Sequence, residues 1–224
     1  MRYRATSTRT AEMVFYAAVS FSEQLTPMKT LLSNVSLTLF YLACILGSIS
    51  TPTSSEELPR VEMKTSMGTL IIELYPEKSP RTVKNFLNYV NEQYYDEIIF
   101  HRVMNGWVIQ SGNYTEDLVG YETEPPVRNE AANGLKNLRG TLAMARGDDP
   151  HSAAAQFFIN LSDNHSLDHE ARTMDLYGYC VFGRVLQGME VADAIGIVET
   201  HEHEGFANLP VKPVRIDTVR LLNR

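Results

Sequence analysis

Cysteine is scarce in this chain, which has 224 residues and only two cysteines, Cys44 and Cys180. Two cysteines cannot build the disulfide framework that holds many small secreted domains together, so a stable core must come from apolar packing. Cys180 stands in the apolar run of residues 179–182. That setting predicts a buried thiol that behaves as a small apolar side chain rather than a reactive group.

An excess of basic charge is also missing. The chain has 20 Lys and Arg against 27 Asp and Glu, a formal net charge of -7 and a pI near 5.4. This balance argues against a large basic face for nucleic acid or for anionic lipid. With 44% hydrophobic residues, the length fits one globular domain and an additional segment.

The sequence signatures of several enzyme classes are absent. No internal repeat, glycine-rich phosphate loop or GxSxG turn occurs in the chain. Repeat folds, P-loop nucleotide enzymes and α/β-hydrolases are therefore not indicated.

An apolar stretch near the N-terminus has the layout of a secretory signal. Lys29 is followed by no charged residue until Glu56, and small residues come after the apolar part. We predict a signal peptide over residues 28–50, with Ser48 and Ser50 at the small-residue positions before the cleavage site. The protein is then exported, and the predicted location is the periplasm.

The segments on either side of this signal have separate interpretations. Residues 51–59 are rich in Ser, Thr, Pro and Glu and predict a flexible leader without the apolar content to fold. Residues 1–27 have no clear place before a signal peptide. Our hypothesis is that translation starts at Met28 and that residues 1–27 are a mis-annotated upstream start. Peptides from residues 1–27 in the precursor would contradict this hypothesis.

Three alternatives stay open for the same region. Tyr41-Leu42-Ala43-Cys44 faintly resembles a lipoprotein processing site, although a Leu is usual where Tyr41 stands. The charge-free stretch is long enough for an uncleaved membrane anchor, but its Ser, Thr and Asn weaken that interpretation. An organelle transit peptide is the third alternative, and the downstream apolar segment favours export over it.

From residue 60 onward the apolar and polar residues alternate as in β-strands. Val61–Ser66 and Thr69–Leu74 predict a hairpin around Met67-Gly68. Ile98–Val103 and Trp107–Gln110 predict a second hairpin, with Asn-Gly in its turn to supply positive φ angles. Further strands are predicted at Thr141–Ala145, Phe157–Asn160, Tyr179–Val185 and Val214–Leu222. The alternation shifts midway in the last one, which suggests either a bulge or a strand buried on both faces.

Two helices are predicted far apart in the chain. Ser79 as N-cap and Pro80 as the first helical residue begin the first helix, whose apolar residues recur at helical spacing up to Asn91. A shorter helix is predicted at Met189–Ile195. Many short strands without a βαβ rhythm predict a mainly β protein with a closed antiparallel architecture rather than a parallel sheet.

Four separated motifs carry a stronger signal when they are taken together. They are FHRVMNGWVIQSGNY at 100–114, GTLAMAR at 140–146, AQFFIN at 155–160 and YCVFGRVLQGMEV at 179–191. Over residues 61–224 the chain resembles the cyclophilins, especially bacterial periplasmic members, and we assign residues 60–224 to such a domain. The resemblance implies an eight-stranded antiparallel β-barrel capped by two α-helices. The active groove would lie on the outer face, because side chains fill the interior of so small a barrel.

The activity implied by this resemblance is peptidyl-prolyl cis-trans isomerisation. Amide resonance gives the X-Pro bond a rotation barrier of about 18–20 kcal/mol, and rotation makes or breaks no covalent bond. No cofactor and no metal are therefore expected. The expected partners are proline-containing segments of unfolded or exported polypeptides, without nucleic acid, and with a membrane only through the signal or an anchor. The protein is expected to be a monomer.

The resemblance also implies roles for individual residues. Arg102 aligns with the catalytic arginine, whose charged, forked guanidinium can favour the twisted amide over either planar form. Gln110 would orient Arg102 and contact the substrate, and His101 is predicted to be a structural, hydrogen-bonding histidine. Trp107, Val108, Phe158, Leu167 and Tyr179 align with the apolar proline pocket, and Ala145, Arg146 and Gln156 with the neighbouring edge that binds the peptide backbone.

Several positions depart from the family pattern, among them three that bear on the site. Trp107 stands where Phe is common, Val108 where Met is common, and Arg146 where many members have Asn. A catalytically weak binding or chaperone module of the same fold is therefore the alternative function. The presence of Arg102, Gln110 and Phe158 argues against it.

Histidines supply a weak case for a metal site. His165 and His169 have i, i+4 spacing, and His201 and His203 alternate within an acidic run. Without cysteines or a clear third ligand, we interpret the run of residues 201–204 as a solvated acidic loop.

Overall fold

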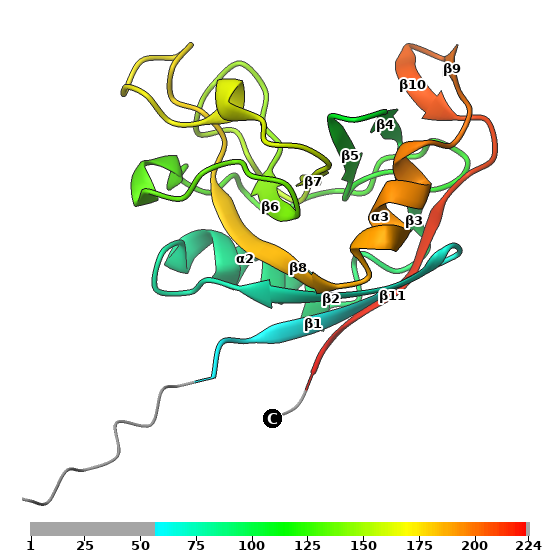
Figure 1. Cartoon of the computed structure of the whole chain (residues 1–224), viewed down its shortest axis with the longest axis horizontal. Helices are drawn as coiled ribbons and strands as arrows, with labels where there is room; N and C mark the ends of the chain where they lie inside the picture. The colour runs from blue at the N-terminus through cyan, green and yellow to red at the C-terminus, as the bar shows by residue number, and fades with distance from the viewer. Residues whose placement is uncertain (1–56, 223–224) are drawn as a thin grey trace, which may run out of the picture. The chain divides into compact units, whose positions relative to one another are not determined.

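The computed structural model describes residues 57–222 (Figure 1). Nine strands form one antiparallel sheet, in the order β3-β11-β1-β2-β8-β6-β7-β5-β4, and two more form a separate hairpin. The strands are β1 Arg60–Thr65, β2 Gly68–Leu74, β3 Ile98–Ile99, β4 Arg102–Met104, β5 Val108–Ser111, β6 Thr141–Met144, β7 Phe157–Asn160, β8 Val181–Gln187, β9 Thr200–His203, β10 Phe206–Pro210 and β11 Arg215–Leu221. The helices are α2 Pro80–Asn91 and α3 Met189–Gly196, with short 3-10 helices η1 Ala131–Asn133 and η2 His165–Leu167. Within residues 57–222 no helix is both long enough and apolar enough to cross a membrane.

The sheet is strongly curled, and its two edge strands follow each other directly in the chain. β3 pairs with β11 at one edge and β4 pairs with β5 at the other, with only Phe100 and His101 between them. The segment Ile98–Val103, predicted as one strand, therefore forms two short strands with a bend between them. The covalent chain at this bend connects the two edges of the sheet and so completes a ring of strands. Counted as one bent strand, β3 and β4 give eight strands around the ring, so the predicted fold class is confirmed (Figure 1).

The inside of the curled sheet is filled by side chains. Along β7, Phe157 and Ile159 point into the main core, whereas Phe158 belongs to a separate cluster on the outer face. Phe86 of α2 packs on Phe157 at a ring-centroid distance of 5.7 Å, and on Phe182 of β8 at 5.2 Å. Apolar side chains among residues 57–222 therefore fill the interior, as expected for so small a barrel, and leave the outer face for binding.

The start of α2 differs from its prediction in one respect. Ser79 precedes the helix and Pro80 is its first residue, as predicted, but the Ser79 side chain makes no capping bond. Ser79 is fully buried, and its hydroxyl donates to the Val181 carbonyl oxygen at 2.8 Å. The carboxylate of Glu130 accepts instead from the Thr82 backbone N–H and hydroxyl, both at 2.9 Å. A loop residue distant in sequence therefore caps the helix.

Two predictions near the C-terminus have different outcomes. The bulge predicted in the last strand is confirmed, because Lys64 pairs with Thr218 and Thr65 with Ile216, which leaves Asp217 unmatched. The loop predicted at residues 201–204 is wrong, since β9 and β10 form a two-stranded hairpin there. His201 and His203 are exposed, as a solvated segment requires.

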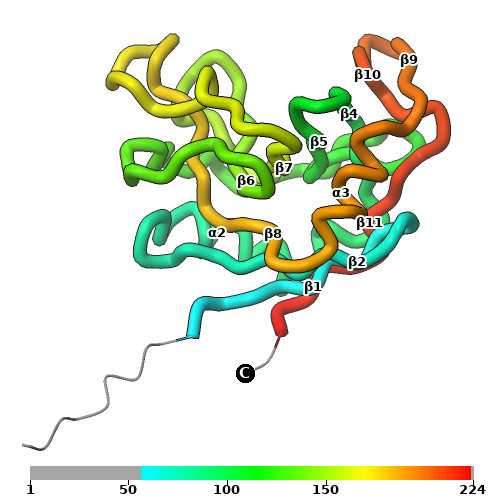
Figure 2. Tube along the Cα trace, in the orientation of Figure 1, coloured from blue at the N-terminus to red at the C-terminus, as the bar shows by residue number. Residues whose placement is uncertain are grey.

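The two ends of the described domain lie together. β1 and β11 are antiparallel neighbours, and the backbone N–H of Leu222 donates to the Arg60 carbonyl oxygen at 2.9 Å. Figure 2 shows both segments at the same edge of the molecule, away from the β9–β10 hairpin. The first and last strands therefore stabilise each other.

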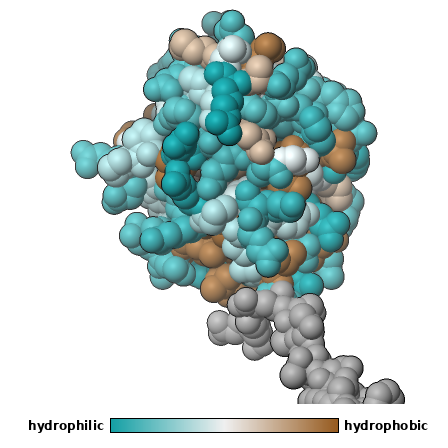
Figure 3. Space-filling model, turned by 90° about the vertical axis from the view of Figure 1, so that its left-hand side faces the viewer, coloured by the Kyte–Doolittle hydropathy of each residue, from teal (hydrophilic) through white to brown (hydrophobic). Residues whose placement is uncertain are grey.

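The surface and Cys180 have the properties expected of an ordinary globular domain. Cys180 is 2% exposed, as predicted, and burial raises the pKa of its thiol. On the face at the left of Figure 1, hydrophilic residues predominate and apolar residues form small separate patches (Figure 3). Scattered apolar residues of this kind are usual on a soluble protein.

Candidate active site

A second hydrophobic cluster lies on the outer face of the sheet, and we call it the outer cluster. Four of its residues are buried: Val108, Ala143, Phe158 and Val181. Trp107, Leu135, Ala145, Leu167 and Tyr179 are partly buried against them. All five residues predicted for a proline pocket are in the outer cluster, so the structure brings them together.

The period of two along each strand explains why this cluster forms. In β6, Leu142 and Met144 point into the main core, and the intervening Ala143 faces outward. Ala143 pairs with Phe158 across the β6–β7 ladder. Sequence reasoning missed Ala143, Leu135 and Val181, although the alternation in β6 was a signal for Ala143.

A polar chain runs along one side of the outer cluster. Arg102 of β4 is paired with Gln110 of β5, and its Nη1 donates to the Gln110 Oε1 at 3.2 Å. The Gln110 Nε2 in turn donates to the Gln156 Oε1 at 2.9 Å. The Arg102 guanidinium lies 5.2 Å from the centroid of the Trp107 ring, which is a cation–π contact. The two predicted catalytic residues are therefore hydrogen-bonded to each other beside an apolar surface.

A second arginine also contacts the outer cluster. The Arg146 guanidinium lies 4.7 Å from the centroid of the Tyr179 ring. Its Nε donates to the Gly178 carbonyl oxygen at 3.2 Å. Tyr179 contacts Phe158 edge to face at 5.6 Å. Ala145 and Gln156 meet through a backbone hydrogen bond of 3.0 Å, so the predicted edge residues lie side by side.

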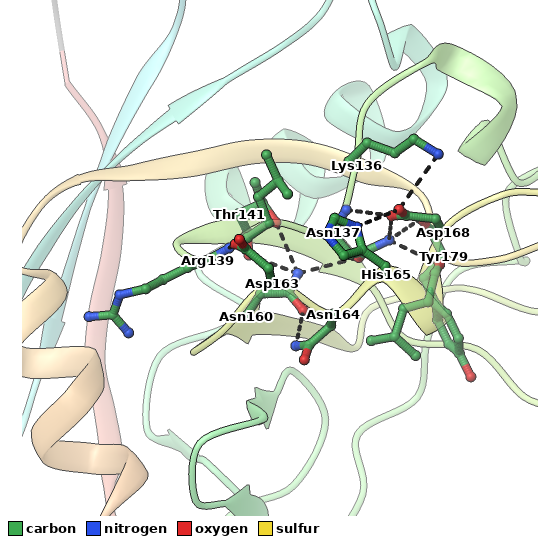
Figure 4. Close-up of polar contacts among 12 residues, drawn as sticks. Lys136, Asn137, Arg139, Thr141, Asn160, Asp163, Asn164, His165, Asp168 and Tyr179 are labelled. Carbon is green, nitrogen blue, oxygen red and sulfur yellow. Dashed lines mark hydrogen bonds and ion pairs between the residues drawn. The ribbon is translucent and has the colours of Figure 1, made fainter.

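A buried polar network supports the walls of the outer cluster (Figure 4). Asn137 is fully buried, and its Nδ2 donates to the Leu167 carbonyl oxygen at 2.9 Å and to the Tyr179 carbonyl oxygen at 3.4 Å. The Asn164 Nδ2 donates to the carbonyl oxygen of Trp107 at 2.9 Å. Three wall residues are thus held through their main chains, which fixes where their side chains stand.

The network continues to Asp168, which is 6% exposed. Its Oδ1 accepts the backbone N–H of Asn137 at 2.7 Å, and its Oδ2 lies 3.3 Å from the His165 Nδ1 and 3.5 Å from the Lys136 Nζ. Burial alone would raise the pKa of Asp168. The hydrogen bonds from Asn137 and His165, together with the Lys136 charge, hold that pKa below its usual value. Asp168 therefore stays ionised and keeps the segment after η2 fixed.

Replacing Asn137 with alanine is expected to lower the free energy of unfolding by about 2 kcal/mol, because buried carbonyl groups lose their donor. The kcat/KM for an X-Pro peptide is expected to fall as the walls of the outer cluster relax. Urea unfolding and the isomerase assay measure the two effects. Asn91→Ala, at the exposed end of α2, is the matched control and should change stability by no more than about 0.5 kcal/mol. An Asn137→Ala variant with wild-type stability and activity would rule out the support role.

The histidine that precedes Arg102 is buried in apolar surroundings. His101 is 5% exposed, and its ring contacts Tyr114 edge to face at 4.8 Å. Its Nδ1 has no hydrogen-bond partner within residues 57–222, whereas hydrogen bonding of the imidazole to the Gln156 side chain and the Ile99 backbone acts to raise its pKa. The structural, hydrogen-bonding role of His101 stays a prediction. Burial, with the adjacent Arg102 charge, lowers the pKa of His101 to about 4.

The histidine pairs do not converge on a metal site. The His165 Nδ1 faces Asp168, whereas the His169 Nδ1 lies 2.7 Å from the Tyr177 carbonyl oxygen. The His201 and His203 rings are stacked with centroids 5.5 Å apart. In the part of the chain that the structure describes, no three His, Cys, Asp or Glu side chains form a group that could hold a metal ion.

Sequence comparisons show which known proteins this chain resembles. The chain matches the family model described as "Cyclophilin type peptidyl-prolyl cis-trans isomerase/CLD" over residues 60–221. It is 48% identical to peptidyl-prolyl cis-trans isomerase cyp18 of Streptomyces antibioticus over 162 residues, which cover 72% of this chain and 98% of the relative. It is 46% identical to peptidyl-prolyl cis-trans isomerase B of Escherichia coli K12, over 71% of this chain and 97% of the relative.

Comparison with solved structures points to the same family. A cyclophilin type peptidyl-prolyl cis-trans isomerase of Cryptosporidium parvum has a TM-score of 0.64 and 25% sequence identity, over 75% of this chain and 99% of that chain. The same protein in the presence of the dipeptide Ala-Pro has a TM-score of 0.63 and 26% identity, over 74% of this chain and 99% of that chain.

Proposed function

The chain belongs to the cyclophilin-type peptidyl-prolyl cis-trans isomerases and has their activity, and from this premise we propose where it acts and on which proteins. Rotation takes place over the outer cluster, beside Arg102, and the substrates are X-Pro segments of exported proteins. The observation that carries the location is a guanidinium held at the rim of an apolar surface by Gln110 and the Trp107 ring.

The chemistry follows from what changes as the X-Pro bond twists. In the planar amide the nitrogen lone pair is conjugated with the carbonyl group, and in the twisted form it is localised on nitrogen. A charged N–H donor such as Arg102 interacts more strongly with the localised lone pair, and only this difference lowers the barrier. The apolar walls from Phe158 and Tyr179 hold the proline ring while the chain on the other side of the bond turns.

Gln110 has a positioning part in this scheme. Its Oε1 accepts from Arg102 and its Nε2 donates to Gln156, so the amide cannot rotate without losing one of these bonds. The guanidinium is thus directed before substrate arrives, and little reorganisation is needed during rotation. The alternative of a catalytically weak binding module rests on the departures at Trp107, Val108 and Arg146. The arrangement of Arg102, its orienting amide and the apolar wall supports the isomerase instead.

The only tryptophan of the chain provides a direct test of the location. Trp107 is a wall of the outer cluster, so its fluorescence should change when an X-Pro peptide binds and saturate with the peptide concentration. A matched peptide with alanine in place of proline should have little effect. The similar Cryptosporidium parvum structure, determined in the presence of the dipeptide Ala-Pro, supports this choice of ligand. Isomerase activity without any change in Trp107 fluorescence would move the site elsewhere.

The export of the protein rests on the N-terminal pattern, with Lys29 followed by a charge-free apolar stretch. Expression of the full chain in a Gram-negative host, followed by fractionation and N-terminal sequencing, tests it. The expected result is periplasmic protein that begins near Thr51. Full-length protein in the cytoplasmic fraction would contradict both the export and the class of substrates.

A further inference from the structure

A cavity of about 380 Å³ opens next to the outer cluster. Ala145 belongs to both, and Arg146 lies between them, since its guanidinium covers the Tyr179 ring while it also lines the cavity. A peptide whose proline occupies the outer cluster must therefore pass the mouth of this cavity. Its own side chains, one to three residues from the proline, are within reach, because an extended chain advances by about 3.3–3.6 Å per residue.

The charge of the cavity is one-sided. Among the residues that line it, Arg146 is the only charged one, and the polar remainder are the amides Gln110, Asn113 and Gln156 and the hydroxyls Thr123 and Ser152. No Asp or Glu is part of the lining, as far as residues 57–222 form it, although the chain as a whole has a net charge of -7. An uncompensated cation in a recess of an acidic protein favours an anionic occupant.

The Arg146 guanidinium is fixed without being neutralised. Its Nε donates to the Gly178 carbonyl oxygen at 3.2 Å, and its Nη1 donates to the Gly147 carbonyl oxygen at 2.9 Å. No carboxylate within residues 57–222 forms an ion pair with Arg146, and Nη2 has no hydrogen-bond partner in that range. Because the fork is already positioned, binding an anion costs little side-chain entropy.

The amides of the cavity offer donors rather than acceptors. The Asn113 Oδ1 already accepts from the Tyr94 hydroxyl at 2.9 Å, and the Gln156 Oε1 already accepts from Gln110 at 2.9 Å. The NH₂ group of Asn113 has no hydrogen-bond acceptor among residues 57–222, whereas the Gln156 side chain is also hydrogen-bonded with His101. The cavity therefore presents free N–H groups from Arg146 and Asn113, which are donors that suit a carboxylate.

We propose that this cavity binds an aspartate or glutamate side chain of the substrate, so that X-Pro bonds close to an acidic residue are preferred. Arg146 is then a specificity-determining residue, distinct from the donor Arg102. The inference rests on the proposed location of catalysis over the outer cluster. It concerns the choice of substrate and does not alter how the bond is rotated.

The test compares X-Pro peptides that carry glutamate or the isosteric glutamine at each position from three before to three after the proline. For the wild-type domain, kcat/KM is expected to be about tenfold higher for glutamate at one of these positions, and high salt should reduce the difference. Arg146→Gln should abolish the glutamate preference, so that the glutamate and glutamine peptides give the same kcat/KM whatever its common value. Arg146→Lys, which keeps the charge without the fork, should retain part of the preference.

Each outcome separates this inference from the proposed site. Equal rates for glutamate and glutamine peptides in the wild type overturn the inference, and so does a preference that survives in Arg146→Gln. In both cases turnover of the glutamine peptide with a change in Trp107 fluorescence leaves the proposed location standing. If that fluorescence does not respond to any peptide that is turned over, the proposed location fails first, and the inference fails with it.

Discussion

Replacing Arg102 with alanine is expected to lower kcat/KM for an X-Pro peptide by about 10²- to 10³-fold, equivalent to about 3–4 kcal/mol of transition-state stabilisation. The variant loses the only charged donor that Gln110 and Trp107 hold in place. The fold should persist, because Arg102 is not in the main core. A protease-coupled isomerisation assay measures the rate, and circular dichroism verifies the fold.

Two further variants provide the comparisons that this experiment needs. Arg102→Lys keeps a positive charge but loses the planar fork that bonds Gln110, so an intermediate loss is expected. Arg81→Ala, on the exposed side of α2, is the matched control and should have wild-type activity. An Arg102→Ala variant that is folded and fully active would show that the twisted amide is stabilised by another group.

The second large effect is a loss of stability at acidic pH that originates from His101. Its pKa is about 4 in the folded protein, against about 6.5 for an unperturbed histidine. Between these values the unfolded chain binds a proton that the folded protein does not, so the free energy of unfolding falls as the pH falls. The difference corresponds to about 3 kcal/mol, which is present in full above pH 6.5 and lost by pH 4.

Comparison with a His101→Gln variant isolates this contribution from those of the carboxylates. Urea unfolding is measured for both proteins between pH 7 and pH 4. The wild type is expected to lose about 3 kcal/mol more than the variant over that range. Parallel pH profiles would mean that His101 binds its proton equally well in both states, and the buried position would then have to be reconsidered.

Local sequence patterns were sufficient for much of the fold. The first hairpin and α2 lie within a residue of their predicted bounds, because strict alternation and Pro80 define them locally. The bend between β3 and β4 was not predictable in this way. It exists because one continuous run pairs with β11 at one end and with β5 at the other, which only the closed sheet determines.

The same distinction holds for the site. The family motifs identified ten candidate site residues, and the structure brings them into one region. Their roles stay predictions until the variants are measured. The buried hydrogen bonds that hold these site residues in place were not predicted, because an asparagine in a loop, such as Asn137, looks like an ordinary turn residue. Their partners, Leu167 and Tyr179, are about thirty to forty positions away in sequence. Glu130 at the start of α2 was missed for the same reason.

The pairing of β1 with β11 also determines when the domain can fold. β1 obtains one of its two neighbours only from Arg215–Leu221, the last strand of the chain. The ring therefore closes only after Arg215–Leu221 has left the ribosome, as expected for a fold rich in contacts between distant segments. On the proposed export route, this delay keeps the domain unfolded, and able to pass through a membrane pore, until β11 has been synthesised.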